Sequence, residues 1–244
     1  MYKENRFDKL SLEQTLLILT SRLNISEQEK IWIKDIIIKK DINWFEFYKL
    51  ALYHKTVALC WKNINQCCVN NYLPKYLRDT IMYLYKCTEI RNQENIEQVK
   101  KIVKKFSSEN ILCIPVKGAY LIPNLYKDYG IRYSGDMDFL VKHDDIVRVK
   151  FILNELGYVN GSYNSITGRI DPLSRTEELK WKIYMSNLPP FYKLSDNSLF
   201  PYFKLDFRFA LDDRLDYEGV NEIIEATKLD GYTLPDYYFI HLCT

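Results

Sequence analysis

Apolar residues recur every three or four positions through the first hundred residues of the chain, which is the period of an amphipathic helix. Glycine, the residue that most often interrupts such a pattern, first appears at Gly118. We therefore expect an all-helical N-terminal region covering residues 1–108.

Helix starts can be placed within this region. Ser11 with Gln14, and Ser26 with Glu29, have the spacing of two capping boxes. Asn43 is a suitable N-cap for a third helix that begins WFEFYKLALY. The pattern predicts two more helices, the first from His54 to about Cys68 and the second, a long one, from Pro74 to about Ser108.

The pattern changes at Asn110, after which short β-branched and alternating runs appear. They predict a strand at 111–116, a helix at 118–126, a strand at 136–141, and a helix at 144–156 that ends at Gly157. In the second strand Met137, Phe139 and Val141 share one face, and Asp136, Asp138 and Leu140 share the other. The order is strand, helix, strand, helix.

The remaining residues predict further elements of both kinds. A helix is expected around 177–184, and the rest of 158–187 has no clear pattern. Residues 191–194 and 200–209 are expected to form a hairpin across the turn at 195–198, and helices are expected near 218–227 and after Pro235. Together these elements predict an α+β protein, with a helical region at 1–108 and a mixed-sheet core with C-terminal helices at 109–244.

Composition narrows the class of protein. The chain has 244 residues, 47% of them hydrophobic, with 34 Lys and Arg against 32 Asp and Glu, which excludes a disordered or collagen-like protein. No apolar run approaches the ~20 residues that span a bilayer, and the N-terminus has no apolar leader, so we expect a soluble cytoplasmic protein without a membrane partner. Six cysteines without CxxC spacing favour reduced, mostly buried thiols.

Charge is unevenly distributed along the chain. Residues 1–110 carry 19 basic and 13 acidic side chains, a net charge of +6, and residues 111–244 carry 15 and 19, a net charge of −4. These values do not require a nucleic-acid partner, although the basic half could face an anionic acceptor.

Two acidic residues are the strongest candidates for chemistry. Asp136 and Asp138 lie two positions apart on one predicted strand, so their carboxylates share a face with Cα atoms about 7 Å apart. Like charges at this spacing are usually neutralised by a divalent cation, and carboxylate oxygens suit Mg²⁺. Asp206, on the polar face of a strand that could neighbour the first, is the candidate for a third ligand, although it could instead pair with Lys204 or Arg208.

Residues around this pair could bind a nucleoside triphosphate (NTP). Lys117 and Gly118 occupy a predicted strand-to-helix junction, where free amides and the helix dipole favour an anion. Arg132, Ser134 and Gly135, on the loop that enters the second strand, could clamp phosphate oxygens.

At these positions the sequence resembles the uncharacterised nucleotidyltransferase family of the DNA polymerase beta-like superfamily. The matching residues are Lys117-Gly118, Gly130, Arg132, Gly135, Asp136, Asp138, Leu140, Val141, and the helix end Leu156-Gly157-Tyr158. The resemblance is strong over about residues 110–160. It implies a polymerase-beta-like core in which a nucleoside monophosphate passes from an NTP to an acceptor and pyrophosphate is released.

The resemblance also implies a site and its cofactors. Asp136 and Asp138 would hold two Mg²⁺ ions, with Mn²⁺ as a substitute, and the third acid of the superfamily falls at Asp206. The chain departs from the superfamily pattern by reading Lys117-Gly118-Ala119 where a Gly-Ser pair is usual, and by reading Lys204-Leu205-Asp206-Phe207 where a His often follows the acid.

Three functions remain open from the sequence. We favour transfer to a hydroxyl or similar group of a small molecule or peptide. A toxin-type enzyme that modifies tRNA or protein, and a nucleotide-binding module without turnover, are the alternatives.

Overall fold

The computed structural model describes residues 9–184, 186–210 and 217–230. The helix expected after Pro235 lies outside this part of the chain. The chain forms two compact units, the first running to Ile90 and including Asp128–Tyr133, the second comprising Arg91–Lys127 and the residues from Ser134 onward. The division expected after residue 108 stays a prediction, because these units meet within a single long helix.

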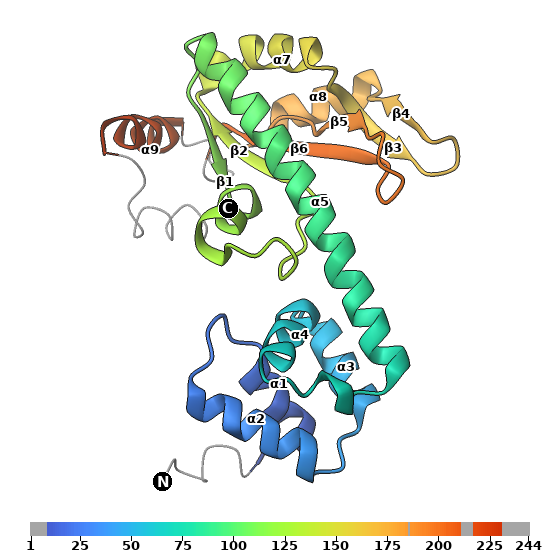
Figure 1. Ribbon diagram of the computed structural model, residues 1–244. Coiled ribbons are helices and arrows are strands. Elements are labelled where there is room, and N and C mark those ends of the chain that lie inside the picture. The colour runs from blue at the N-terminus through green and yellow to red at the C-terminus, as the bar shows by residue number, and fades with distance from the viewer. Residues whose placement is uncertain (1–8, 185, 211–216, 231–244) are drawn as a thin grey trace. The chain divides into compact units, whose positions relative to one another are not determined.

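The first unit is helical (Figure 1). Its elements are α1 (Leu12–Thr20), α2 (Glu27–Lys39), α3 (Trp44–Tyr53), α4 (Val57–Gln66), the 3₁₀ turn η2 (Asn70–Tyr72), and the first half of α5 (Lys75–Ser108). Buried side chains at helical spacing, among them Leu16, Ile33, Phe47 and Ile64, form one core. The helices expected from the sequence are confirmed, with α4 shorter at both ends than expected.

The predicted helix starts are also confirmed. Ser11 and Ser26 both form complete capping boxes, in which the serine hydroxyl accepts from the third helical amide and that residue's side chain accepts from the serine amide. The side chain of Asn43 accepts from the amide of Glu46 at 3.1 Å. These bonds satisfy amides that the first helical turn leaves without a partner.

The second unit contains a six-stranded mixed sheet in the order β1-β2-β6-β5-β3-β4. The strands are β1 (Cys113–Val116), β2 (Met137–Val141), β3 (Val159–Asn164), β4 (Arg169–Pro172), β5 (Phe191–Leu194) and β6 (Tyr202–Arg208). Only β2 and β6 are parallel among the paired strands described. The α+β class with a mixed sheet is confirmed, and so is the β5–β6 hairpin.

Helices cover parts of both faces of this sheet (Figure 1). They are α6 (Gly118–Leu121), the π turn η3 (Ile122–Tyr126), the 3₁₀ turn η4 (His143–Asp145), α7 (Ile146–Glu155), α8 (Arg175–Tyr184), α9 (Tyr217–Asp230), and the second half of α5. None of the helices in the described ranges has both the length and the apolar character needed to cross a bilayer.

The two faces of the sheet differ in chemistry. On one face Phe139 and Phe207 stack with ring centroids 4.8 Å apart and belong to a core that includes Phe106 of α5 and Val149 of α7. On the other face Leu140 packs against Val220 and other residues of α9. Beyond β2, along β6, β5 and β3, this second face carries polar and aromatic side chains, and we call it the polar face.

The hairpin of β3 and β4 is absent from the sequence expectation. Asn, Ser and Gly residues weaken the alternating pattern there, β4 is largely exposed, and β3 is mostly half-buried. Gly161 is required at its place, because a Cβ atom would lie 2.2 Å from the carbonyl oxygen of Asp171.

Gly157 has φ +83°, which confirms its expected role as the residue after α7.

Candidate active site

Two candidate aspartates lie side by side on the polar face. Asp138 of β2 is paired in register with Asp206 of β6, and neighbouring residues in register point to the same side of a sheet. Asp136 precedes Asp138 by two residues and lies immediately before β2, which begins at Met137 rather than at the expected residue 136. The expectation that the strand of Asp206 neighbours that of Asp138 is therefore confirmed.

Each carboxylate has a polar partner. The Lys117 ammonium donates to Asp138 Oδ1 at 3.0 Å, and the Lys204 ammonium donates to Asp136 Oδ2 at 3.2 Å. The side-chain amide of Asn187 donates to Asp206 Oδ1 at 3.0 Å. Lys204 lies on the same face of β6 as Asp206, but it forms its ion pair with Asp136.

Two groups of the site, Asp138 and Lys204, have pKa values above their ordinary ones. Asp138 is only 6% exposed, and burial raises the pKa of its carboxyl group. Lys117 opposes this rise, while Asp136 and Asp206 add to it. Burial alone would lower the pKa of Lys204, but the charge and hydrogen bond of Asp136 outweigh it, so the pKa is raised.

The donor set suits a hard divalent cation, although the side chains are not assembled into a cage. Asp136, Asp138 and Asp206 offer only carboxylate oxygens; burial is the main cause of the raised pKa of Asp138, and the charges of Asp136 and Asp206 add to it. Among the described residues, no three His, Cys, Asp or Glu side chains converge closely enough to hold a metal unaided. Mg²⁺ usually takes one or two carboxylates, with water and phosphate oxygens completing its shell, so these residues fit it.

The junction after β1 has the backbone strain that functional sites often carry. Lys117 has φ 48° and ψ −126°, a conformation that residues with side chains rarely adopt. Gly118 begins α6, and a Cβ atom there would lie 2.4 Å from Ser134 Oγ. The predicted phosphate-binding residues Gly118 and Ser134 are thus in contact distance. α6 continues directly into η3, so residues 118–126 are helical as expected, with the second half a π turn.

Helix α5 fixes the loop that leads into β2. The side-chain amide of Asn95 donates to the carbonyl oxygen of Ser134 at 3.1 Å, and the guanidinium of Arg91 donates to that of Gly135 at 3.1 Å. The Ser134 hydroxyl donates to the carbonyl oxygen of Asp136 at 2.8 Å. Ser134 and Gly135 are therefore held beside the aspartates.

Arg132, the remaining predicted phosphate ligand, belongs to the first unit together with the rest of Asp128–Tyr133. Its role in phosphate binding stays a prediction.

Gly130, which the family resemblance includes, has a packing role in that unit. A Cβ atom at Gly130 would lie 2.4 Å from the ring of Tyr85, so only glycine lets this ring pack against the backbone.

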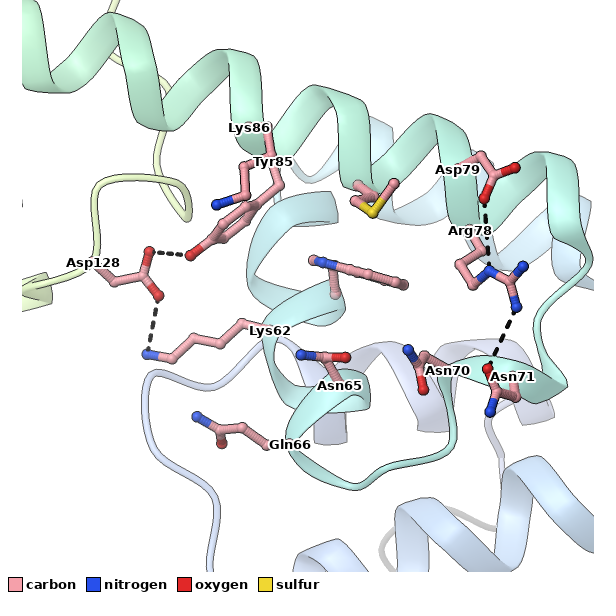
Figure 2. A pocket seen from close by; sticks show the side chains of 12 residues that line it. Lys62, Asn65, Gln66, Asn70, Asn71, Arg78, Asp79, Tyr85, Lys86 and Asp128 are labelled. Carbon is pink, nitrogen blue, oxygen red and sulfur yellow. Dashed lines mark hydrogen bonds and ion pairs between the residues drawn. The ribbon is translucent and has the colours of Figure 1, made fainter.

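The first unit also contains a cavity of about 640 Å³. Asp128 lies in the wall of this cavity and contacts two other lining residues (Figure 2). The Tyr85 hydroxyl donates to Asp128 Oδ1 at 2.6 Å, and the Lys62 ammonium lies 3.9 Å from Asp128 Oδ2. The other lining residues are mostly amides and charged side chains: Trp61, Asn65, Gln66, Asn70, Asn71, Arg78, Asp79, Met82 and Lys86. The pocket contains none of the three aspartates.

Several residues of the site were missed by sequence reasoning. Lys204 was expected on the face of Asp206 as a possible partner of that residue, but its pairing with Asp136 was not predicted. Asn187, Arg91 and Asn95 lie far from the motif in sequence and belong to no recognisable pattern. Their positions depend on strand pairing and on the path of α5, which a single sequence does not specify.

Comparison with known families agrees with this arrangement. A family described as "Uncharacterised nucleotidyltransferase" matches residues 40–203, which is more than half of the chain. The protein therefore belongs to this nucleotidyltransferase family. The matched segment includes Asp136 and Asp138 and ends shortly before Asp206. No curated protein and no solved structure matches the chain.

Proposed function

We propose that this protein is a metal-dependent nucleotidyltransferase that moves a nucleoside monophosphate from an NTP to a hydroxyl acceptor and releases pyrophosphate. The observation that carries the proposal is the register of Asp138 with Asp206 on adjacent parallel strands, with Asp136 at the entrance to β2. Membership of the nucleotidyltransferase family supports it.

Binding of the triphosphate is assigned to the loop beside the aspartates. Gly118 lets Ser134 lie directly against the junction after β1, and backbone amides at this junction would supply donors to phosphate oxygens. Lys117 would add positive charge, and the role of Arg132 in phosphate binding stays a prediction. These groups would hold the β- and γ-phosphates so that the α-phosphate lies at the aspartates.

Asp136, Asp138 and Asp206 would hold Mg²⁺, or Mn²⁺ in its place. A divalent ion bound there would neutralise phosphate oxygens and lower the pKa of the acceptor hydroxyl. Lys117 and Lys204 now contact two of these acids, so they must turn away when the metal binds. Lys117 could then contact a phosphate oxygen, exchanging one anionic partner for another.

The transfer balances as an in-line substitution. The acceptor oxygen forms a bond to the α-phosphorus, the bond from that phosphorus to the bridging oxygen breaks, and pyrophosphate leaves. The acceptor proton passes to Asp206 or to solvent. Most of the acceleration would come from positioning and from charge stabilisation.

Calorimetric titration tests this function. Each NTP is titrated with Mg²⁺ or Mn²⁺ into wild-type protein and into the double variant Asp136→Ala/Asp138→Ala, and pyrophosphate release is followed in the same samples. We expect metal-dependent binding of at least one NTP that the double variant loses. Asp171→Ala, at an exposed position of β4 in the same sheet, is the matched control and should behave as wild type.

Two outcomes would change the assignment. Failure of folded wild-type protein to bind any NTP would refute the transferase. Tight NTP binding without added metal and without turnover would favour the nucleotide-binding module, since the lysine–aspartate pairs already neutralise two of the acids.

The net charge of +6 over residues 1–110 favours the second candidate, an enzyme that modifies tRNA. Nucleic acid that co-purifies and is released steeply by salt would support it.

A further inference from the structure

Three tyrosines form a cluster on the polar face of the sheet, on strands next to the aspartates. They are Tyr163 of β3, Tyr192 of β5 and Tyr202 of β6. The strand registers place Tyr192 opposite Lys204, so these rings share the face of Asp138 and Asp206. All three are partly exposed.

The rings contact one another at different inclinations. Tyr163 and Tyr202 have ring centroids 4.7 Å apart with planes at 42°, and Tyr192 and Tyr202 have centroids 5.2 Å apart with planes at 65°. The guanidinium of Arg91 lies 6.0 Å from the centroid of the Tyr202 ring and 5.2 Å from that of Phe200, and it donates to the carbonyl oxygen of Gly135. The three rings thus form an aromatic surface whose ring planes are tilted relative to one another, and Arg91 of α5 lies beside it.

The cluster is close enough to the aspartates for one ligand to contact both. Tyr202 lies four residues before Asp206 on β6, which corresponds to about 13 Å along the strand. Tyr192 lies on the next strand, about 5 Å away sideways. Burial raises the pKa of the Tyr192 phenol, with Asp136 and Asp206 adding to the rise and Lys204 opposing it. Lys204 lies opposite Tyr192 in the strand register and pairs with Asp136.

The order of the strands separates the two substrates. The phosphate-binding residues Lys117 and Gly118 follow β1, on one side of β2, whereas the tyrosines lie on the other side, beyond Asp206. In-line transfer requires the acceptor to approach the α-phosphorus opposite the leaving pyrophosphate. We infer that the tyrosine cluster binds the acceptor, and that the acceptor is a sugar. This inference rests on the proposed transferase function.

The chemistry of the cluster favours a sugar over other hydroxyl acceptors. A tyrosine offers an apolar ring face and a hydroxyl group, which match the C–H face and the hydroxyls of a sugar ring. The mutual tilt of the rings leaves no flat wall on which successive bases could stack. The net charge of −4 over residues 111–244 opposes a polyanion such as RNA.

Ligand-observed NMR on the full chain tests the inference. Methyl β-D-glucopyranoside, maltose, glucosamine, adenosine, a serine-containing tripeptide and bulk tRNA are offered separately with Mg²⁺ and a non-hydrolysable NTP analogue. We expect saturation transfer to at least one sugar, and a loss of affinity of about tenfold or more in Tyr163→Leu and Tyr202→Leu. Tyr163→Phe and Tyr202→Phe, which keep the ring, should bind it within a few-fold of wild type.

Separate nucleotide titrations distinguish the two substrates. The leucine variants should retain the NTP affinity of wild type, and so should Tyr76→Leu, a control at an exposed position of α5. Weakened NTP binding in the Tyr163 and Tyr202 variants would overturn the inference, because the rings would then hold the base. Binding of tRNA or peptide but of no sugar would overturn it too. If wild-type protein binds no NTP, the proposed function itself fails, which the sugar-free titration reveals independently.

Discussion

Gly118 and Ser134, sixteen residues apart in sequence, approach so closely that a Cβ atom on Gly118 would lie 2.4 Å from Ser134 Oγ and 3.1 Å from Ser134 Cβ. Turning the Ser134 hydroxyl away would break its hydrogen bond to the carbonyl oxygen of Asp136. The contact therefore links the strand-to-helix junction after β1 to the loop that positions the aspartates.

Gly118→Ala is expected to push this loop away from the junction. We predict a loss of NTP affinity of about tenfold, equivalent to about 1.4 kcal/mol, and a stability cost of about 1–3 kcal/mol from overpacking. Calorimetry and urea unfolding measure the two effects. The double variant Gly118→Ala/Ser134→Gly removes the obstructing atoms and should recover part of the affinity. Wild-type affinity in Gly118→Ala would contradict a role for this contact.

Asp138→Asn is expected to lower activity and to raise the free energy of unfolding. Burial raises the pKa of Asp138 in the folded protein above its ordinary value of 3.8, so ionisation of this group costs folding free energy. Below pH 3.8 the carboxyl group is protonated in both the folded and unfolded states, and the penalty appears as pH rises through the folded pKa. The variant should therefore match wild type near pH 3 and be more stable by about 1 kcal/mol near pH 8.

Urea unfolding at both pH values, in chelator to exclude metal, measures this difference. Pyrophosphate release by the variant should fall by about 10²-fold or more, as when a charge-stabilising group is removed from an active site. Asp171→Asn serves as the control for the loss of one negative charge. A variant less stable than wild type at pH 8 would mean that the Lys117 pair outweighs the burial of Asp138.

Local sequence signals specified those parts of the molecule that short-range physics determines. Capping boxes at Ser11 and Ser26 predicted helix starts because each requires only residues three apart. The alternation along β6 placed Asp206 on a polar face because side chains in any strand alternate. The Asp136 and Asp138 pair was found for the same reason.

Long-range pairing explains what the sequence left out. The bond from Asn187 to Asp206 and the two bonds from α5 to the 134–135 loop depend on how distant segments pack. The cluster of Tyr163, Tyr192 and Tyr202 forms only when three strands are set in register, which no local pattern shows. The β3–β4 hairpin was missed because its strands lack an alternating apolar pattern.

Gly130→Ala tests whether this glycine of the family motif is structural. The new Cβ atom would overlap the Tyr85 ring, whose hydroxyl is held by Asp128, so we expect a loss of stability of about 1–3 kcal/mol. Thermal unfolding measures the loss. The control is Gly168→Ala, where φ is +67° but no atom lies within 4 Å, so only backbone strain of about 1–2 kcal/mol is added. Adding Tyr85→Leu to Gly130→Ala should reduce the penalty, and an unchanged penalty would argue against the ring contact as its cause.

Glu29→Gln tests the electrostatics of the capping box at the start of α2. The hydrogen bond from the Ser26 amide is the main cause that lowers the pKa of Glu29 below its ordinary value of 4.5, with burial opposing it and Arg22 assisting. A lowered folded pKa stabilises the protein above pH 4.5, and this stabilisation is lost as pH falls through the folded pKa. We expect the variant to cost about 0.3–1 kcal/mol at pH 7, the usual value of an acid in a first helical turn, and nothing near pH 3. Asp35→Asn, in the middle of the same helix, is the control for a lost surface charge. A cost in Glu29→Gln that stays constant between pH 7 and pH 3 would mean that hydrogen-bond geometry, rather than the charge of the carboxylate, stabilises this helix start.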